Sequence, residues 1–316
     1  MVAPPTDTFE TYAAKGNRED LSDVIYNISP FDTPFLSAIE VTDATAVKHE
    51  WQTDALAAAV SNNQVEEGLD AVTTAVSATV RLNNTCQISD KVPRVSGTQQ
   101  GVLKAGRGDE LEYQIAKMAK ELKTDMETHA LANVGDTTGS SGTARIAGSV
   151  LAFVGTNQSV GSGGVAPSGL DGSNTRTDGT QRPFTETLAK SVIKGCWDEG
   201  GDPDCIMVGS FNKQKFSTFT GNATREVGAE DKALYASIDV YDSDFGELQV
   251  FPNRFMRARD ALVLQKDMWA IAYLRTFQLH DLAKTGDSER RQLLAEYTIE
   301  SRNEKASGIV ADLNTS

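Results

Sequence analysis

Apolar residues recur every three or four positions between Lys104 and Gly135, and this is the longest regular pattern in the chain. The apolar positions are Leu111, Ile115, Met118, Leu122, Met126 and then His129 or Ala130. Such a period indicates an amphipathic helix with one narrow apolar stripe. The remaining arc is polar and contains Lys117, Lys120, Glu121, Lys123, Asp125 and Glu127. A narrow stripe predicts a helix that lies across a sheet rather than one enclosed in a core.

Both ends of this helix carry residues that are typical of helix termini. Asp109 stands at the N-cap position with Glu112 three places later, as in a capping box, and Asn133-Val134-Gly135 is a usual glycine exit. The helix predicted over 109–134 would be roughly 37 Å long at about 1.5 Å per residue. We therefore expect a long spine helix at this place.

Ahead of the helix, between residues 44 and 82, the period changes to two. The alternating apolar positions are Val47, His49 and Trp51 in a first run and Val76, Ala78, Val80 and Leu82 in a second. This alternation predicts two strands, separated by a long polar stretch that includes Glu66-Glu67-Gly68. An isolated two-stranded ribbon is marginally stable, so we expect this hairpin to rest on another chain. A further strand at 85–96 leads into the helix.

Residues 1–40 form a polar arm in which Phe9 and Tyr12 are isolated aromatic residues. So little apolar surface does not stabilise a fold by itself, and we expect the arm to lie on a neighbouring subunit. Its end contains a short amphipathic segment at 18–28 and a helical turn at 30–39.

The second half of the chain predicts a separate module. Residues 136–183 are rich in Gly, Ser, Thr and Asn and indicate an excursion over the surface, with one short ordered piece at 146–154. Two helices follow, at 184–197 with Thr185 as its cap and at 211–219 with Ser210 as its cap. The expected strands are 205–208, 238–241, 248–251, 261–264 and 268–274. Together these elements predict a compact α+β module. Strands at 295–300 and 306–313 would return to the first domain and complete the sheet under the spine helix.

Charge narrows the range of partners. The chain has 316 residues with 30 Lys and Arg against 44 Asp and Glu, a net charge of -14. This balance argues against a protein that coats nucleic acid, because non-specific binding depends on basic side chains that release counterions. Three cysteines without a CxxC spacing predict neither a disulfide framework nor a zinc ribbon. The sequence has no signal peptide and no membrane span, so we expect a cytoplasmic product that contacts no membrane.

The sequence offers no catalytic set. His49, His129 and His280 are scattered, without a second histidine at ligand spacing. Residues 242–246 match part of a calcium loop, but the acid of the twelfth position is replaced by Asn253, so a hairpin turn between Val240 and Leu248 explains them better. We expect no catalytic, cofactor-binding or metal-binding residues, and no enzyme.

The order of these parts resembles that of tailed-phage major capsid proteins with the Hong Kong phage-type capsid fold. Four stretches carry the resemblance: HEWQTDAL at 49–56, LNNTCQISDKVPRVSGTQQ at 82–100, GRGDELEYQIAKMAKELKTDME at 106–127 and NEKASGIVADL at 303–313. The resemblance implies an α+β fold with an N-arm at 1–40 and an extended E-loop hairpin at 41–92. It also implies a peripheral domain at 93–185 plus 285–316 and an inserted axial domain at 186–284.

The resemblance implies a structural protein that forms hexamers and pentamers of an icosahedral head around double-stranded DNA, without sequence-specific DNA binding. It would be part of the virion capsid, assembled in the cytoplasm of the bacterial host. Possible partners are portal and decoration proteins and a separate scaffolding protein, since no coiled segment precedes Thr33. The candidate interface residues are Phe9, Tyr12, Trp51, Glu66 and Glu67, the last two facing a basic patch on a neighbour. Two alternatives are an encapsulin-like nanocompartment and a hydrolase or sugar-binding enzyme with its site in the Gly-rich region.

Overall fold

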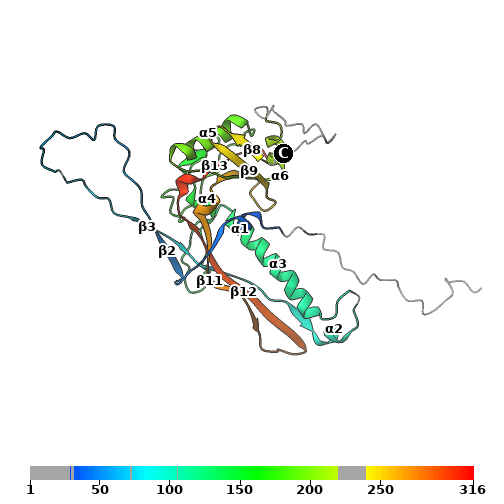
Figure 1. Ribbon diagram of the computed structural model, residues 1–316. Coiled ribbons are helices and arrows are strands. Elements are labelled where there is room, and N and C mark those ends of the chain that lie inside the picture. The colour runs from blue at the N-terminus through cyan, green and yellow to red at the C-terminus, as the bar shows by residue number, and fades with distance from the viewer. Residues whose placement is uncertain (1–28, 30–31, 72, 105, 220–239) are drawn as a thin grey trace, which may run out of the picture.

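The computed structural model describes residue 29 and residues 32–71, 73–104, 106–219 and 240–316. Phe9 and Tyr12, the helical segment expected at 18–28 and part of the strand expected at 238–241 lie outside the described residues. Two sheets make up the body, and a thin hairpin projects far from it (Figure 1). The expected α+β class is confirmed.

A five-stranded sheet lies in the lower part of the molecule in Figure 1 and contains the two longest strands, β11 (Trp269–Asp281) and β12 (Ser288–Ser301). Its other strands are β1 (Glu40–Asp43), β4 (Gln87–Lys91) and β5 (Arg94–Ser96). The order is β1-β11-β12-β4, and β5 also pairs with β12. β1 runs parallel to β11, whereas β12 is antiparallel to β11, β4 and β5. The central strand β12 therefore joins segments from both ends of the chain.

The predicted spine helix is α3 (Glu110–Ala130), which lies along β12 and β4 (Figure 1). Its buried residues Leu122, Met126 and Ala130 pack with Tyr297 and other side chains of the sheet, as the narrow apolar stripe predicts. The Oδ1 atom of Asp109 accepts the N–H of Glu112 at 3.0 Å, which confirms the predicted N-cap.

Two details of this helix differ from the prediction. The helix ends at Ala130 and not near Gly135. A Cβ at Gly135 would lie 2.4 Å from the carbonyl oxygen of Ser173, so this glycine permits a close approach of two loops and is not a helix exit. Glu127, placed by its charge on the polar arc, is completely buried.

The upper part of the molecule contains a six-stranded sheet. Its strands are β6 (Asn157–Ser159), β7 (Cys205–Val208), β8 (Val240–Ser243), β9 (Gly246–Pro252), β10 (Ala261–Leu264) and β13 (Gly308–Val310), in the order β6-β13-β10-β7-β9-β8. The helices α5 (Glu186–Asp198) and α6 (Ser210–Phe216) share one apolar cluster with this sheet, which includes Ile193, Phe216 and Tyr241. The prediction of a buried strand at 205–208 and of a hairpin turn between Val240 and Leu248 is confirmed.

Short elements fill the remaining connections. They are α1 (Pro34–Ala38), α2 (Gly97–Gly101), α4 (Val150–Phe153) and the 3-10 turns η2 (Lys266–Met268) and η3 (Glu304–Ala306). Thr185 is the N-cap of α5 as expected, although its side chain makes no capping bond. The N-cap of α6 is Gly209, so the prediction that Ser210 caps this helix is wrong by one residue.

Strand pairing differs from the prediction at two places. The strand expected at 268–274 in the inserted module is part of β11, which pairs with β1 and β12 in the five-stranded sheet. The strand expected at 306–313 under the spine helix is β13, which instead pairs with β10 and β6. Alternation of side chains identifies a strand, but it carries no information about which distant strand is its neighbour.

The Gly-rich region 136–183 is more than a surface excursion. Its segment from Ser149 to Val154 is completely buried and includes α4. Phe153 lies in the larger apolar cluster and meets the indole of Trp269 edge to face, with 6.4 Å between ring centroids. Arg176, farther along, is only 3% exposed. The small residues of this region therefore allow close packing of loops onto both sheets.

Candidate assembly surfaces

The projecting hairpin consists of the strands β2 (Lys48–Thr53) and β3 (Val80–Thr85) and a long loop between them. Every described residue of 54–71 and 73–79 is exposed. The loop holds large apolar side chains in water, because Leu56 is 99% and Val76 95% exposed. Figure 1 shows the loop extending away from both sheets. Such side chains ordinarily find a partner, and the body of this chain does not supply one for them.

The base of the hairpin, in contrast, is attached to its own chain. The indole N–H of Trp51 donates to the carbonyl oxygen of Ser301 at 2.7 Å, and its ring lies 6.1 Å from that of Phe153. The side chain of His49 is 3.1 Å from Glu300, and this hydrogen bond is the main reason that the pKa of Glu300 is lowered. The structure thus places Trp51, a predicted interface residue, within its own chain as an anchor of the hairpin.

A second attachment comes from Asn84 of β3, which is completely buried. Its amide group donates to the carbonyl oxygens of Ile299 at 2.8 Å and Gly148 at 3.0 Å, and its Oδ1 accepts the N–H of Gly148 at 2.7 Å. Both N–H donors and the oxygen of this amide therefore bind the backbone of the body. The hairpin has a fixed base and an unsupported loop.

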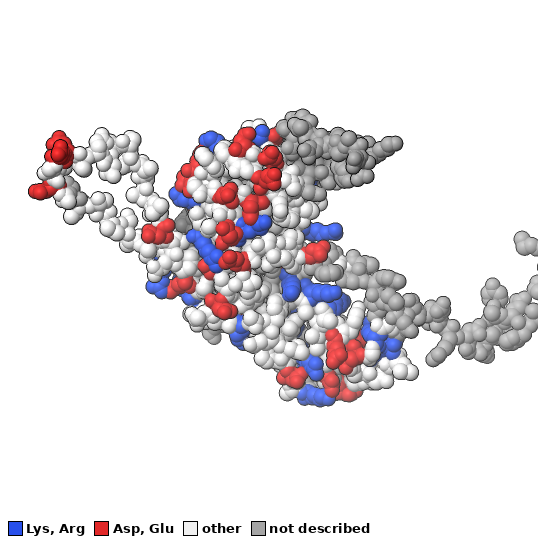
Figure 2. Space-filling model, in the orientation of Figure 1, with Lys and Arg blue, Asp and Glu red and all other residues white. Residues whose placement is uncertain are grey.

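The tip of the loop is acidic. Glu66 and Glu67 precede Gly68, whose φ of 85° lets the chain turn so that the N–H of Leu69 reaches the carbonyl oxygen of Glu66 at 3.2 Å. Asp70 follows, and the described part of the loop between Thr53 and Val80 contains neither lysine nor arginine. Figure 2 shows these acids as an isolated red group at the end of the projection. Glu66 and Glu67 are therefore exposed at the tip of the loop, and their contact with a neighbour stays a prediction.

Glu127 is a buried carboxylate that the sequence pattern missed. Its Oε1 accepts the N–H of Phe35 at 2.8 Å and the amide of Asn253 at 2.6 Å, and its Oε2 accepts the N–H of Leu36 at 2.9 Å. Burial raises its pKa, and the three hydrogen bonds oppose that shift. Thr33, the N-cap of α1, makes no side-chain capping bond, so Glu127 of α3 takes this role. The carboxylate joins the spine helix, α1 and the loop after β9.

A second buried ionic group lies between the Gly-rich region and the C-terminal segment. Asp312 has a φ of 60° and accepts the N–H groups of Gly161 at 3.0 Å and Gly179 at 2.8 Å, as well as Arg259 at 2.7 Å. Asp260 is completely buried and lies 2.9 Å from Arg257. Burial raises the pKa of Asp260 to about 6, while Arg257 and Arg176 act in the opposite direction. These contacts hold the Gly-rich region against the six-stranded sheet.

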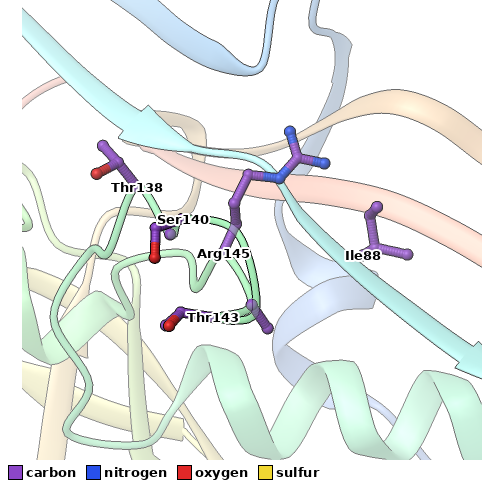
Figure 3. A pocket seen from close by; sticks show the side chains of 7 residues that line it. Ile88, Thr138, Ser140, Thr143 and Arg145 are labelled. Atoms are coloured by element: carbon purple, nitrogen blue, oxygen red, sulfur yellow. The ribbon is translucent and has the colours of Figure 1, made fainter.

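An open hollow of about 400 Å³ lies beside the edge strand β4. Figure 3 shows Arg145 reaching from the loop 138–145 toward the strands, with Ile88 of β4 on the other side and Thr138, Ser140 and Thr143 along the loop. Arg145 is held by Glu296 at 2.6 Å, and Arg275 binds the other oxygen of Glu296 at 2.7 Å. The described residues that line this hollow include neither a carboxylate nor a histidine.

His129 and the three cysteines are further candidates for chemistry. His129 is bound to the carbonyl oxygen of Ala147 at 2.9 Å, and burial lowers its pKa. The cysteines Cys86, Cys196 and Cys205 are buried and free, and burial raises their pKa values. Within the described ranges no three His, Cys, Asp or Glu side chains gather as a metal site would require. No described helix combines the length and apolar character needed to cross a membrane.

Comparison with known proteins agrees with this arrangement. Residues 5–314 match the family model of the SU10 major capsid protein. The major capsid protein of Escherichia phage Phieco32 is 26% identical over 350 residues, which cover 98% of this chain and 97% of that protein.

Solved structures share the fold at low sequence identity. The capsid of a native GTA particle matches with a TM-score of 0.67 at 11% identity and covers 96% of this chain and 98% of its own. The capsid of cyanophage A-1(L) matches with a TM-score of 0.66 at 13% identity, covering 97% and 99% of the two chains. The SrpI encapsulin of Synechococcus elongatus PCC 7942 matches with a TM-score of 0.56 at 10% identity, covering 95% and 93%.

The similarity to these capsid structures shows that this α+β arrangement is the Hong Kong phage-type capsid fold. Since the family model spans almost the whole sequence, the chain belongs to the SU10 major capsid protein family.

Proposed function

We propose that this major capsid protein of a tailed phage assembles into hexamers and pentamers, which close into an icosahedral head around double-stranded DNA. One observation carries the proposal beyond the family: the loop 54–79 exposes apolar side chains to water on a base that is firmly attached to the body. A monomer gains nothing from this arrangement. A neighbouring subunit that covers the loop gains apolar contact area, and the gain is repeated at every position of a shell.

The parts of the chain have distinct roles in this proposal. Residues 1–40 are the N-arm and 41–92 the E-loop, and both lie on neighbours. Residues 93–185 with 285–316 form the peripheral domain, and 186–284 the axial domain around the ring axes. The strands β7, β8 and β9 pair within the proposed axial domain, whereas β11 and β13 each pair across the division, β11 with β12 and β13 with β10. Those two strands bind the proposed domains into one body.

Glu66 and Glu67 are proposed to meet a basic surface of the neighbour, and Phe9 and Tyr12 of the arm to make apolar contacts there. The described part of the loop contains no lysine or arginine, which supports the first contact. A cation in the loop would repel the basic surface of the neighbour and weaken the contact of Glu66 and Glu67. Trp51 has a different role: it fixes the direction in which the loop leaves the body.

The net charge of -14 supports packaging without binding. A wall of this charge repels the phosphates of DNA, so the genome is enclosed by the shell and not held by it. Assembly in the bacterial cytoplasm, and contacts with portal, scaffolding or decoration proteins, are part of the proposal.

Expression of the chain alone and with its neighbouring genes tests this function. Negative-stain microscopy and sedimentation are expected to give closed particles, and terminase and portal genes beside this gene would mark a phage. The similarity to an encapsulin supports a second candidate, a nanocompartment shell. A cargo-enzyme gene with a docking tail in place of terminase and portal, and particles that contain this enzyme without DNA, would decide for it.

A further inference from the structure

An exposed aromatic pair lies on the six-stranded part of the molecule. The ring of Trp197, at the end of α5, is 5.1 Å from that of Phe245, in the turn between β8 and β9. Trp197 is 53% exposed, whereas Trp269 is completely buried. A tryptophan held in water on a second aromatic ring is typical of the centre of a protein interface.

Unpaired acids surround this pair. Asp242 and Glu247 face each other across the β8–β9 hairpin, Asp244 lies in its turn, and Asp202 approaches Gly246. All four are exposed, and none forms an ion pair within the described residues. Like charges directly opposite each other destabilise a strand pair unless a cation compensates them. We name Trp197, Phe245 and these four acids the acid-rimmed patch; Figure 2 shows many acidic side chains over this upper part.

The opposite end of the same strand is cationic. Arg254 follows β9, and Lys215 lies on α6. Two hydrogen bonds hold α6 at this end of the strand: Lys213 donates to the carbonyl oxygen of Val250, and Asn212 donates to that of Ala258. Lys215 and Arg254 are exposed, and neither forms an ion pair within the described part of the chain. We name these two residues the cationic end. Arg254 lies seven positions after Glu247 of the acid-rimmed patch, roughly 20 Å at the rise of a strand.

We propose that the acid-rimmed patch of one subunit packs against the cationic end of the next copy around each ring. The inference rests on the proposed ring assembly and assigns the contact that holds the six-stranded domains together there. Complementary surfaces at opposite ends of one domain make a head-to-tail interface, which closes into a ring when the rotation between subunits allows it. Two acid-rimmed patches repel each other, so the charges also exclude a two-fold contact through this surface. The same acids exclude nucleic acid as the occupant.

Tryptophan fluorescence tests the contact directly, because Trp197 is the exposed indole among Trp51, Trp197 and Trp269. Acrylamide should quench unassembled subunits strongly, and the quenching should fall several-fold in purified shells. The Trp197→Phe variant, with its aromatic ring retained, should lose this difference, which assigns the signal. Shells in which wild-type quenching is unchanged would overturn the inference but leave the shell itself established.

Charge exchange provides the second test. The pair Asp244→Lys and Glu247→Lys, and separately Lys215→Glu with Arg254→Glu, should each raise the protein concentration needed for assembly about ten-fold, equivalent to about 1.4 kcal/mol. Combining all four substitutions should restore assembly toward the wild-type concentration, because attraction is re-established with reversed signs. Additive defects in the combined variant would contradict the contact, as would protection of Trp197 only after a second protein is added. If the wild-type chain forms no shells at all, the proposed function fails and this inference fails with it.

Discussion

Glu127 of α3 accepts the backbone N–H of Phe35 at 2.8 Å, across 92 positions of sequence. This bond ties the spine helix to α1. The same oxygen also accepts the amide of Asn253 at the end of β9. The buried carboxylate of Glu127 thus fixes the relative positions of the spine helix, α1 and the six-stranded sheet.

Replacing Glu127 by glutamine should therefore loosen this junction. The substitution preserves volume but replaces one acceptor oxygen by an NH₂ group, which then faces the N–H of Phe35 or Leu36. Leaving a buried donor unsatisfied costs about 1–3 kcal/mol of the free energy of unfolding. Amide hydrogen exchange at Phe35 and Leu36 should become faster, because the free energy of local opening there falls by the same amount. The control is Glu121→Gln, at a partly exposed position of the same helix. Equal stability of the two variants would show that Glu127 does not hold α1.

Asp260 should make stability depend on pH in the mildly acidic range. Burial raises its pKa from 3.8 to about 6, so the folded chain binds this proton more tightly than the unfolded chain. Between about pH 4 and pH 6 unfolding releases the proton, and the contribution of Asp260 to stability decreases as the pH rises. One pKa unit corresponds to about 1.4 kcal/mol, so the decrease is of the order of a few kcal/mol.

Denaturant titrations of unassembled subunits at several pH values measure this dependence. The Asp260→Asn variant carries no ionisable group at this position, and the stability difference between wild type and variant should change across the window. Asp281→Asn, at an exposed position, should leave the wild-type profile unchanged. Parallel profiles for wild type and Asp260→Asn would contradict the assignment.

Trp51 should contribute to the stability of the subunit and not only to assembly. Truncation to alanine removes its contact with Phe153 and its bond to the carbonyl oxygen of Ser301, and for a half-buried ring the expected cost is about 2–3 kcal/mol. Phenylalanine retains most of the contact and loses the hydrogen bond, at a cost of about 1 kcal/mol. Thermal unfolding of unassembled subunits distinguishes these values. If the Trp51→Ala variant is as stable as the wild type but fails to assemble, Trp51 acts at the interface between subunits and does not anchor the hairpin.

Glu66 and Glu67, unlike Trp51, should affect assembly without affecting the stability of the subunit. Because both are exposed at the loop tip, changing them to lysine should leave the unfolding of the subunit unchanged while lowering the yield of particles. The matched control is Glu66→Asp with Glu67→Asp, which preserves charge and should assemble normally. Particle yield by sedimentation gives the answer, and normal yield from the double lysine variant would remove these acids from the interface.

Local patterns predicted α3 and the hairpin because each depends on side-chain periods within one short segment. Glu127 could not be found in this way: a carboxylate at the margin of an apolar stripe is ordinarily solvated, and its partners lie 91 to 126 positions away in sequence. The same reason explains the misplaced pairing of β11 and β13, since pairing is decided by non-local contacts. The alternation places Trp51 on the apolar face of the hairpin and suggests an interface residue, but alternation cannot tell an intrachain neighbour from another subunit.

Cryo-electron microscopy of particles assembled from this chain would show directly whether the hairpin loop of each subunit lies on a neighbouring subunit. We expect closed icosahedral shells in which residues 54–79 of each subunit lie against the adjacent subunit, with Leu56 and Val76 covered. Preparations that contain only isolated subunits, with the same loop folded back onto its own sheets, would contradict this expectation.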